Sequence, residues 1–212
     1  MIALPMNTPS LRLRHIVVEE AVRMMELNGE PSTRRWLPSH VYANEQEAAE
    51  RMRYLISCYL TPGDPRLGPY VLAVDHIASG ALLGHVGFSP FVSDVEVSYG
   101  IAEDYRRRGY GAEALYFACK WAASSFGLPR LLAITESENA PSRKTLDRAR
   151  FVHSEDSVMR FQGTEQTVSH YLWHPSAGEA QMAALGAAVS TGLLRLWVEA
   201  AAQPLLQGMR IR

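Results

Sequence analysis

The stretch YRRRGYGAEAL, which runs from Tyr105 to Leu115, places three arginines and two glycines directly before a helical pattern. The first backbone N–H groups of a helix lack intrahelical partners and lie at the positive end of the helix dipole, so a phosphate fits there. Glycines permit close approach because they have no Cβ, and guanidinium groups recognise phosphate bidentately. The stretch therefore predicts a diphosphate site formed by Arg106, Arg107, Arg108, Gly109, Tyr110, Gly111 and Ala112.

Two nucleotide-binding motifs compete with this interpretation. A P-loop requires Gly-Lys-Ser/Thr after its glycines, whereas Gly-Ala-Glu follows here at positions 111–113. The dinucleotide fingerprint Gly-x-Gly-x-x-Gly/Ala is matched by Gly109, Gly111 and Ala114, with Glu136 22 residues beyond Ala114. That fingerprint directly follows an apolar strand, however, and here the polar segment AEDYRRR intervenes. An NAD-dependent oxidoreductase is therefore the weaker alternative.

Hydrophobic periodicity on both sides of this stretch indicates strands and helices. Predicted strands cover residues 11–17, 70–75, 81–91, 95–101 and 131–136, followed by two more between Phe151 and His174. Predicted helices cover 19–27, 45–60, 111–126 and 140–150, with loops at 31–44 and 61–69. Asn44 and Gly127 are the expected caps of the second and third helices. The order, with closely linked antiparallel strands first and a strand–helix–strand–helix section after them, predicts an α/β (α+β) domain over residues 1–175.

Residues 176–212 form a different kind of segment. Apolar residues recur at steps of three or four from Met182 to Ala200, which predicts a helix with one apolar stripe. The stripe is expected either to pack on its own domain or to form a homodimer interface. A membrane span is disfavoured because the uncharged run, Ala180 to Leu194, is only 15 residues long.

Composition excludes several classes of function. The formal net charge of −1 gives no general attraction to nucleic acid or to an anionic membrane. Two cysteines, Cys58 and Cys119, cannot form a disulfide framework, and no secretory signal is apparent at the N-terminus. We therefore expect a cytoplasmic protein. His170 and His174 lie on a predicted strand, far apart along it, so no metal site is predicted.

At Arg106, Gly109 and Gly111 the sequence resembles the GNAT superfamily of acyl-CoA-dependent N-acyltransferases, whose hallmark is Gln/Arg-x-x-Gly-x-Gly/Ala at a strand-to-helix junction. The following segment ITESENAPSRKTLDRARF resembles the family's second motif, and its Asn-x-x-Ser spacing is similar to the branch of ribosomal-protein alanine N-acetyltransferases. The resemblance covers roughly Leu11 to His174. It implies a mixed, mostly antiparallel twisted sheet flanked by helices, with acetyl-CoA as co-substrate and an amine as acceptor.

The resemblance also implies roles for individual residues. Glu96, in the pattern Glu-Val-Ser-Tyr, is the leading candidate for the general base, although an exposed strand carboxylate is the plainer alternative. Glu136 and Glu138 are further candidates. Ser142 or Tyr99 is expected to protonate the departing sulfur. Pantetheine is expected to contact Asn139, Ser142 and the backbone near Ile101, although Asn139 and Ser142 also suit the start of a helix.

Two positions depart from the family pattern. Leu146 stands where many relatives carry the tyrosine that protonates the thiolate, which keeps a non-catalytic CoA-binding module as a second alternative. Arg150 stands where a glycine usually precedes Phe151, so a different cap is expected at the end of that helix.

The acceptor amine must be neutral when it attacks the thioester. At pH 7, neutralising a lysine amine costs about 4.6 kcal/mol, whereas an α-amine with a pKa of about 7.8 costs about 1 kcal/mol. Protein N-termini and small-molecule amines both remain open as acceptors, and Trp36 to Pro38 is a candidate segment for lining their pocket.

Overall fold

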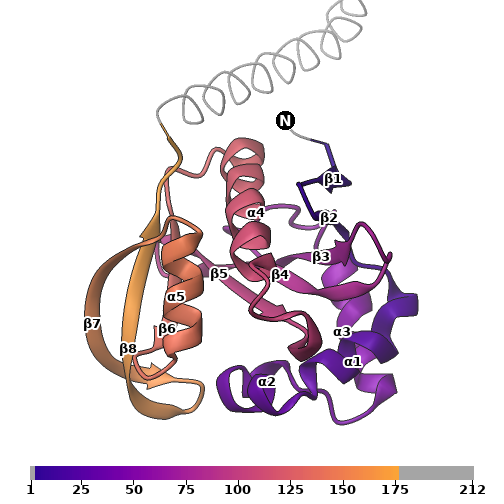
Figure 1. Cartoon of the computed structure of the whole chain (residues 1–212), viewed down its shortest axis with the longest axis horizontal. Helices are drawn as coiled ribbons and strands as arrows, with labels where there is room; N and C mark the ends of the chain where they lie inside the picture. The colour runs from indigo at the N-terminus through magenta and orange to yellow at the C-terminus, as the bar shows by residue number, and fades with distance from the viewer. Residues whose placement is uncertain (1–2, 177–212) are drawn as a thin grey trace, which may run out of the picture.

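The computed structural model describes residues 3–176 and contains one mixed sheet with helices on both faces (Figure 1). The strands are β1 (Met6–Asn7), β2 (Leu11–His15), β3 (Tyr70–His76), β4 (Leu82–Phe91), β5 (Asp94–Ile101), β6 (Leu131–Glu136), β7 (Val152–Phe161) and β8 (Thr164–Trp173). They pair in the order β1-β2-β3-β4-β5-β6-β8-β7. Neighbouring strands are antiparallel except β5 and β6, which are parallel. The predicted α/β (α+β) fold is confirmed.

The helices lie close to their predicted positions, with one addition. They are α1 (Ala21–Asn28), α2 (Pro31–Trp36), α3 (Glu45–Ser57), α4 (Tyr110–Phe126) and α5 (Ala140–Arg148), with 3-10 turns η1 (Val18–Glu20), η2 (Pro38–His40) and η3 (Glu103–Tyr105). The Asn44 side chain accepts a 2.9 Å hydrogen bond from Glu47 N, and Gly127 ends α4 with a φ of 63°, so both predicted caps are confirmed.

The prediction that residues 31–44 form a loop is wrong. Pro31 begins α2, and proline suits a first helical position because its φ is already helical and no N–H is lost. The helix has six residues, too few for a repeating apolar pattern, and among them only Thr33 is buried. The formation of this helix therefore depends on tertiary contacts and not on a repeating apolar pattern in its sequence.

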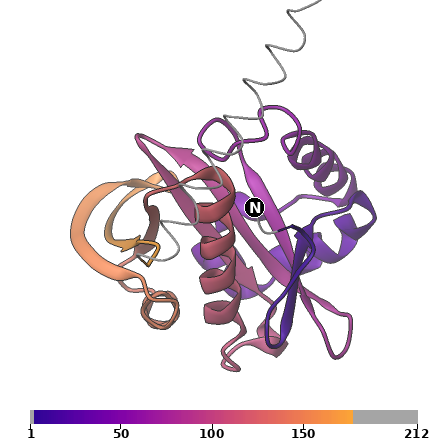
Figure 2. The same cartoon turned by 90° about the horizontal axis from the view of Figure 1, so that it is seen from above.

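Helices cover both faces of the sheet (Figure 2), and each face carries its own apolar cluster. One face packs against α4, whose buried residues include Leu115, Ala118 and Trp121. The other packs against α1 and α3, through Met24 and Met52 among others. Because side chains alternate along a strand, each side chain of β5 points to one of these two faces. The face determines which other residues that side chain can contact.

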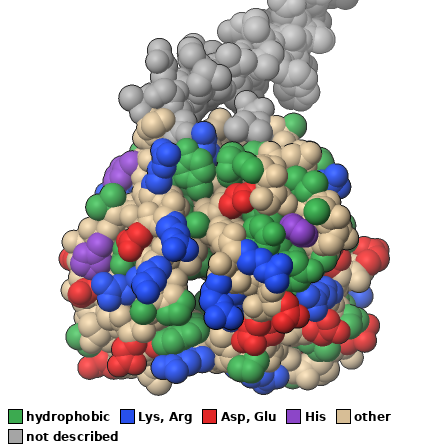
Figure 3. Space-filling view, in the orientation of Figure 1, with side chains coloured by type: hydrophobic (Ala, Val, Ile, Leu, Met, Phe, Trp, Pro, Cys, Tyr) green, Lys and Arg blue, Asp and Glu red, His purple; other side chains and the backbone are tan. Residues whose placement is uncertain are grey.

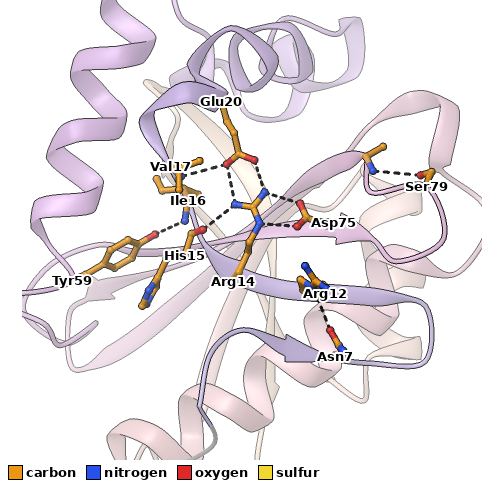
Figure 4. Close-up of polar contacts among 11 residues, drawn as sticks. Asn7, Arg12, Arg14, His15, Ile16, Val17, Glu20, Tyr59, Asp75 and Ser79 are labelled. Atoms are coloured by element: carbon orange, nitrogen blue, oxygen red, sulfur yellow. Dashed lines mark hydrogen bonds and ion pairs between the residues drawn. The ribbon is translucent and has the colours of Figure 1, made fainter.

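A polar network fixes the first strands to the helix that follows them (Figure 4). The guanidinium of Arg14 on β2 donates to Asp75 on β3 at 2.6 and 2.8 Å and to both carboxylate oxygens of Glu20. Ile16 N donates to the Tyr59 hydroxyl at 3.0 Å. The network ties β2 to β3 and to the turn before α1, and so places α1 and α2 relative to the sheet.

The predicted C-terminal extension lies outside the described residues apart from Ser176, so its helix and its homodimer contact stay predictions. Between residues 3 and 176, no helix is both long and apolar enough to cross a membrane.

Candidate functional site

The candidate site lies where β5 and β6 separate. The two parallel strands share a single pair of partners, Glu96 and Leu132, whereas β5 stays paired with β4 from Asp94 to Ile101. The edge of β5 that faces β6 is therefore unpaired beyond Glu96. A cavity of about 930 Å³ occupies this region. Figure 3 shows an opening between the two halves of the molecule with lysine and arginine side chains on both sides.

The loop after η3 brings the start of α4 to this cavity. Gly109 is the N-cap of α4 and has a φ of 89°, a left-handed conformation that favours glycine. A Cβ at this position would meet no atom within 4 Å, so the loop faces open space. The hydrogen bonds within α4 begin with the one that Glu113 N donates to Gly109 O at 3.0 Å. The N–H groups before Glu113 are the ones that helix geometry leaves for a ligand.

The three arginines take three different positions. Arg107 lines the cavity, in a left-handed conformation with a φ of 60°. Arg106 also lines it, but its guanidinium is engaged by Glu30 on the neighbouring segment at 3.0 Å. Arg108 lies over the Tyr105 ring at 5.5 Å and is not among the cavity-lining residues. Of the three, Arg107 is placed best for a phosphate, and their predicted contacts with CoA stay predictions.

Sequence reasoning missed two further cations. Lys144 and Arg148 on α5 line the cavity and are exposed. Their spacing of four residues puts them on one face of α5. That spacing was the available signal, but an exposed basic pair on a helix is too common to indicate a phosphate site without the fold.

Glu96 lies on the α1 and α3 face of the sheet. It is the partner of Ser89 on β4, and it alternates with Val95 and Val97, which belong to the core beneath α4. Burial raises the pKa of the Glu96 carboxyl to about 7, because the charged form is poorly solvated there. The plainer alternative, an exposed strand carboxylate, is therefore excluded for Glu96.

Tyr99 and Ser142 meet on the opposite face of β5. The Tyr99 hydroxyl lies 3.2 Å from Ser142 Oγ, and both side chains line the cavity. Burial raises the pKa of the Tyr99 phenol, so the hydroxyl keeps its proton at neutral pH. Asn139 accepts a 3.1 Å hydrogen bond from Ser142 N and thus caps α5, while it also lines the cavity.

The departures from the family pattern have structural explanations. Leu146 is buried at 1% exposure and contributes to both the core and the cavity wall. Arg150 has a φ of 68°, and Phe151 N donates to Leu146 O at 3.0 Å. This is the left-handed helix end that a glycine would form. The expectation of a different cap is therefore wrong: Arg150 adopts the glycine conformation, with its guanidinium over the Tyr116 ring at 4.9 Å.

The remaining predicted residues are placed as follows. Tyr110, Gly111, Ala112 and Ile101 line the cavity, and Glu136 does so while Glu138 does not. The Tyr110 side chain turns away to His76, with 3.1 Å between its hydroxyl and Nε2. The Ile101 carbonyl accepts a 2.6 Å hydrogen bond from Arg106 Nε, so this acceptor is already engaged.

The cavity extends to a second group of residues. Trp36 and Leu37, from the segment predicted to line an acceptor pocket, are among its lining residues, and Pro38 is not. His40 of η2, Phe161 at the end of β7 and Gln162 of the β7–β8 turn, which the sequence analysis did not single out, line the same part of the cavity. The His40 ring lies 5.4 Å from that of His85, which is on the Glu96 face of β4. Burial lowers the pKa of both histidines, that of His85 to about 3, so both imidazoles are neutral at pH 7. This end of the cavity, beside Glu96, is the natural place for an acceptor.

A family model described as an acetyltransferase (GNAT) domain matches residues 10–152. The chain belongs to the GNAT family. It is thus an acyl-CoA-dependent N-acetyltransferase, and the matched region contains the loop at Gly109, Glu96, Tyr99 and Ser142. No curated protein sequence matches the chain significantly.

Solved structures share the fold of this GNAT protein at low sequence identity. A ribosomal-protein-S5-alanine acetyltransferase from Vibrio fischeri is 16% identical, with a TM-score of 0.70 over 82% of this chain and 98% of that one. RimL, a ribosomal L7/L12 α-N-protein acetyltransferase in complex with coenzyme A, is 14% identical, with a TM-score of 0.67 over 80% and 97%. The microcin C7 self-immunity acetyltransferase MccE, in complex with acetyl-CoA and AMP, is 12% identical, with a TM-score of 0.66 over 79% and 94%.

Proposed function

We propose that this GNAT enzyme transfers the acetyl group of acetyl-CoA to a primary α-amine by direct attack in a ternary complex. One observation carries the proposal. A carboxylate with a pKa of about 7, Glu96, and a neutral hydroxyl pair, Tyr99 and Ser142, lie on opposite faces of β5 and line the same cavity. Acyl transfer to an amine requires one proton to leave the nitrogen and one to reach the sulfur, and these groups suit the two tasks.

Coenzyme A fits the other end of the cavity. The open space at Gly109 and the free N–H groups at the start of α4 suit a diphosphate. Arg107, Lys144 and Arg148 supply positive charge around it. The unpaired edge of β5 supplies backbone groups for the pantetheine amides, as an added strand would receive them. RimL and MccE were solved with coenzyme A or acetyl-CoA, which supports this ligand for the shared fold.

The reaction proceeds in balanced steps. Glu96 accepts a proton from the acceptor ammonium and passes it to solvent, and the neutral nitrogen attacks the thioester carbonyl carbon. The new C–N bond forms as the C–S bond breaks, the surplus proton on the nitrogen passes to Glu96, and the Tyr99–Ser142 pair gives a proton to the departing thiolate. Tyr99 regains that proton from solvent after CoA leaves. No covalent enzyme intermediate is required, and Leu146 is not needed as an acid because the hydroxyl pair supplies the proton.

The pKa of the acceptor itself favours an α-amine over a lysine side chain, and the pKa of Glu96 sets the absolute cost of each transfer. Moving a proton from an α-ammonium of pKa about 7.8 to a carboxylate of pKa about 7 costs about 1 kcal/mol. The same transfer from a lysine of pKa about 10.4 costs about 5 kcal/mol. Peptide N-termini are therefore the proposed class. The ribosomal-protein activity named for the Vibrio fischeri structure supports this class without identifying the acceptor.

Release of CoA from acetyl-CoA, measured with a thiol reagent, tests the proposal. The panel pairs each acceptor peptide with the same peptide carrying a blocked N-terminus and a free lysine. We expect release with free α-amines, and much slower release with lysine alone. Binding of acetyl-CoA with no release for any amine would contradict catalysis and favour the non-catalytic module. Thermal protection by NAD but not by CoA would favour the oxidoreductase alternative.

A further inference from the structure

Helix α2 crosses the acceptor end of the cavity and is fixed at both of its ends. Ser32, Thr33 and Trp36 of α2 line the cavity. In Figure 1 the helix lies beside the tip of the β7–β8 hairpin, which comes from the other half of the molecule. At the first turn the contacts come from Arg106, which the sequence predicts to bind CoA. At the last turn the contact comes from Gln162, which the sequence analysis did not single out.

Arg106 fixes the first turn of α2. Its Nη2 donates to Glu30 Oε2 at 3.0 Å, its Nη1 contacts Ser32 Oγ, and its Nε donates to Ile101 O at 2.6 Å. Glu103 completes the link, because its N–H donates to the Glu30 carboxylate at 3.0 Å while its own carboxylate accepts from Ser32 N at 3.3 Å. All three guanidinium nitrogens thus donate to protein groups, and these contacts hold the side chain against α2.

Gln162 fixes the last turn. Its Nε2 donates to the Trp36 carbonyl at 2.7 Å, across 126 positions of sequence. Trp36 ends α2, where carbonyls lack intrahelical partners. Gln162 and Gly163 both have positive φ, 50° and 92°, so they form the tight two-residue turn that joins twisted antiparallel strands. The turn of this hairpin therefore holds the Gln162 amide against the end of α2, beside the cavity that both elements line.

We propose that Arg106 and Gln162 are positioning residues that hold α2 across the acceptor end of the cavity, and so determine which amines reach Glu96. The proposal rests on the N-acetyltransferase function proposed above. It assigns different roles to two neighbouring arginines. Arg107 binds CoA from the cavity wall, whereas Arg106 affects the acceptor by holding α2 in place. With α2 held at both ends, the opening admits a slim N-terminal residue more readily than a bulky one.

The test compares Arg106→Gln and Gln162→Ala with two control variants. Arg107→Ala removes the cation that faces the cavity, and Arg66→Gln removes an arginine paired with Asp64 in a loop that does not line it. Affinity for CoA is measured by calorimetry in all four. Steady-state kinetics use the tripeptides Ser-Gly-Gly and Trp-Gly-Gly as acceptors. Amide hydrogen exchange reports on residues 32–36 of α2 without requiring turnover.

We expect Arg106→Gln and Gln162→Ala to change the kinetics with the acceptor and to leave the affinity for CoA nearly unchanged. Loss of the charged contacts in Arg106→Gln is expected to raise the KM for Ser-Gly-Gly about 10-fold or more, and loss of the neutral one in Gln162→Ala about 3- to 10-fold. In both, the kcat/KM of Trp-Gly-Gly relative to Ser-Gly-Gly rises, CoA affinity stays within about 3-fold, and exchange in α2 accelerates. Arg107→Ala weakens CoA binding and leaves the acceptor ratio unchanged, and Arg66→Gln changes neither.

Three outcomes overturn the proposal. Weaker CoA binding in Arg106→Gln with unchanged acceptor selectivity would make Arg106 a phosphate ligand. An unchanged selectivity ratio in Gln162→Ala would show that the hairpin contact does not limit access. If the wild-type protein acetylates no amine, the proposed function fails, and the exchange measurement decides the remaining point: unchanged exchange of α2 in both variants would show that neither residue holds the helix.

Discussion

Replacement of Glu96 by glutamine should abolish activity and stabilise the protein, and the stability gain should depend on pH. Burial raises the pKa of Glu96 from an ordinary 4.5 to about 7 in the folded chain. Between these two values the folded state holds a proton that the unfolded state has lost, so the free energy of unfolding falls as the pH rises. At 1.36 kcal/mol per pKa unit, the full cost above pH 7 is about 3 kcal/mol.

Glutamine has nearly the shape of the protonated acid but never ionises, so the variant avoids this cost. Below pH 4.5, wild type and Glu96→Gln should unfold at nearly the same urea concentration. Above pH 7, the variant should be more stable by about 3 kcal/mol, with the difference developing between these limits. Other carboxylates also change stability with pH, but they are common to both proteins and cancel in the difference. Glu155→Gln, on the exposed strand β7, is the matched control.

The ionisation of Glu96 should also control how the reaction rate depends on pH. With an acceptor amine whose own pKa lies below about 5, the amine does not titrate in the measured range, and kcat/KM should rise with pH to a plateau above about 7. In Glu96→Gln this rise of kcat/KM with pH should disappear, and the rate should fall by about 10²- to 10⁴-fold. A stability difference between wild type and Glu96→Gln that is constant from pH 4.5 to pH 8 would refute the burial argument. A preserved pH limb in the variant would refute the role as base.

Four other substitutions test separate parts of the structure. Tyr99→Phe should lower kcat by at least about tenfold while the Kd for CoA changes little, because it removes proton donation rather than binding; a larger effect on Kd than on kcat would contradict this. Ser142→Ala should lower kcat to a similar extent and also raise the Kd for CoA, because Ser142 is expected to contact pantetheine as well; an unchanged kcat would contradict its role as donor. Gly84→Ala should unfold at much lower urea concentration, because a Cβ there would lie 1.9 Å from the Gly100 carbonyl oxygen; overpacking of this kind costs about 1–3 kcal/mol or more, and an unchanged midpoint would show that β4 and β5 can move apart. Asn139→Ala should destabilise α5 by about 1 kcal/mol through the lost cap, and CoA affinity measured in the same variant shows whether the amide has a second role.

Much of the fold was predictable because its signals are local. Alternation of apolar residues predicted β3, β4 and β5 to within about two residues, and the caps at Asn44 and Gly127 act within one turn. The glycine loop before α4 was predictable for the same reason, since the glycines and the following helix are contiguous, whereas its binding of phosphate stays a prediction. Strand β1 and helix α2 were not predicted, because two residues and six residues are too short to show a period.

The site was less predictable, because it depends on distances between segments. The sequence shows three adjacent arginines but not that Glu30, 76 positions away, engages the first of them. In the same way, nothing local marks Gln162 as the partner of Trp36. The residue types at the proposed catalytic positions can be read from the sequence, whereas the burial that raises the pKa of Glu96 depends on the packing of both faces of the sheet.

One element of the chemistry nevertheless follows from spacing alone. Glu96 and Tyr99 are three residues apart on one strand, and an odd spacing puts their side chains on opposite faces of the sheet. A base and an acid on opposite faces cannot exchange a proton directly, so each can serve a different atom of the same reaction. The edge of β5 toward β6 is unpaired beyond Glu96, so in the proposed reaction a thioester lying along that edge would meet Glu96 on the acceptor side and the Tyr99–Ser142 pair on the other. Under that proposal, the separation of two parallel strands gives the nitrogen and the sulfur distinct places.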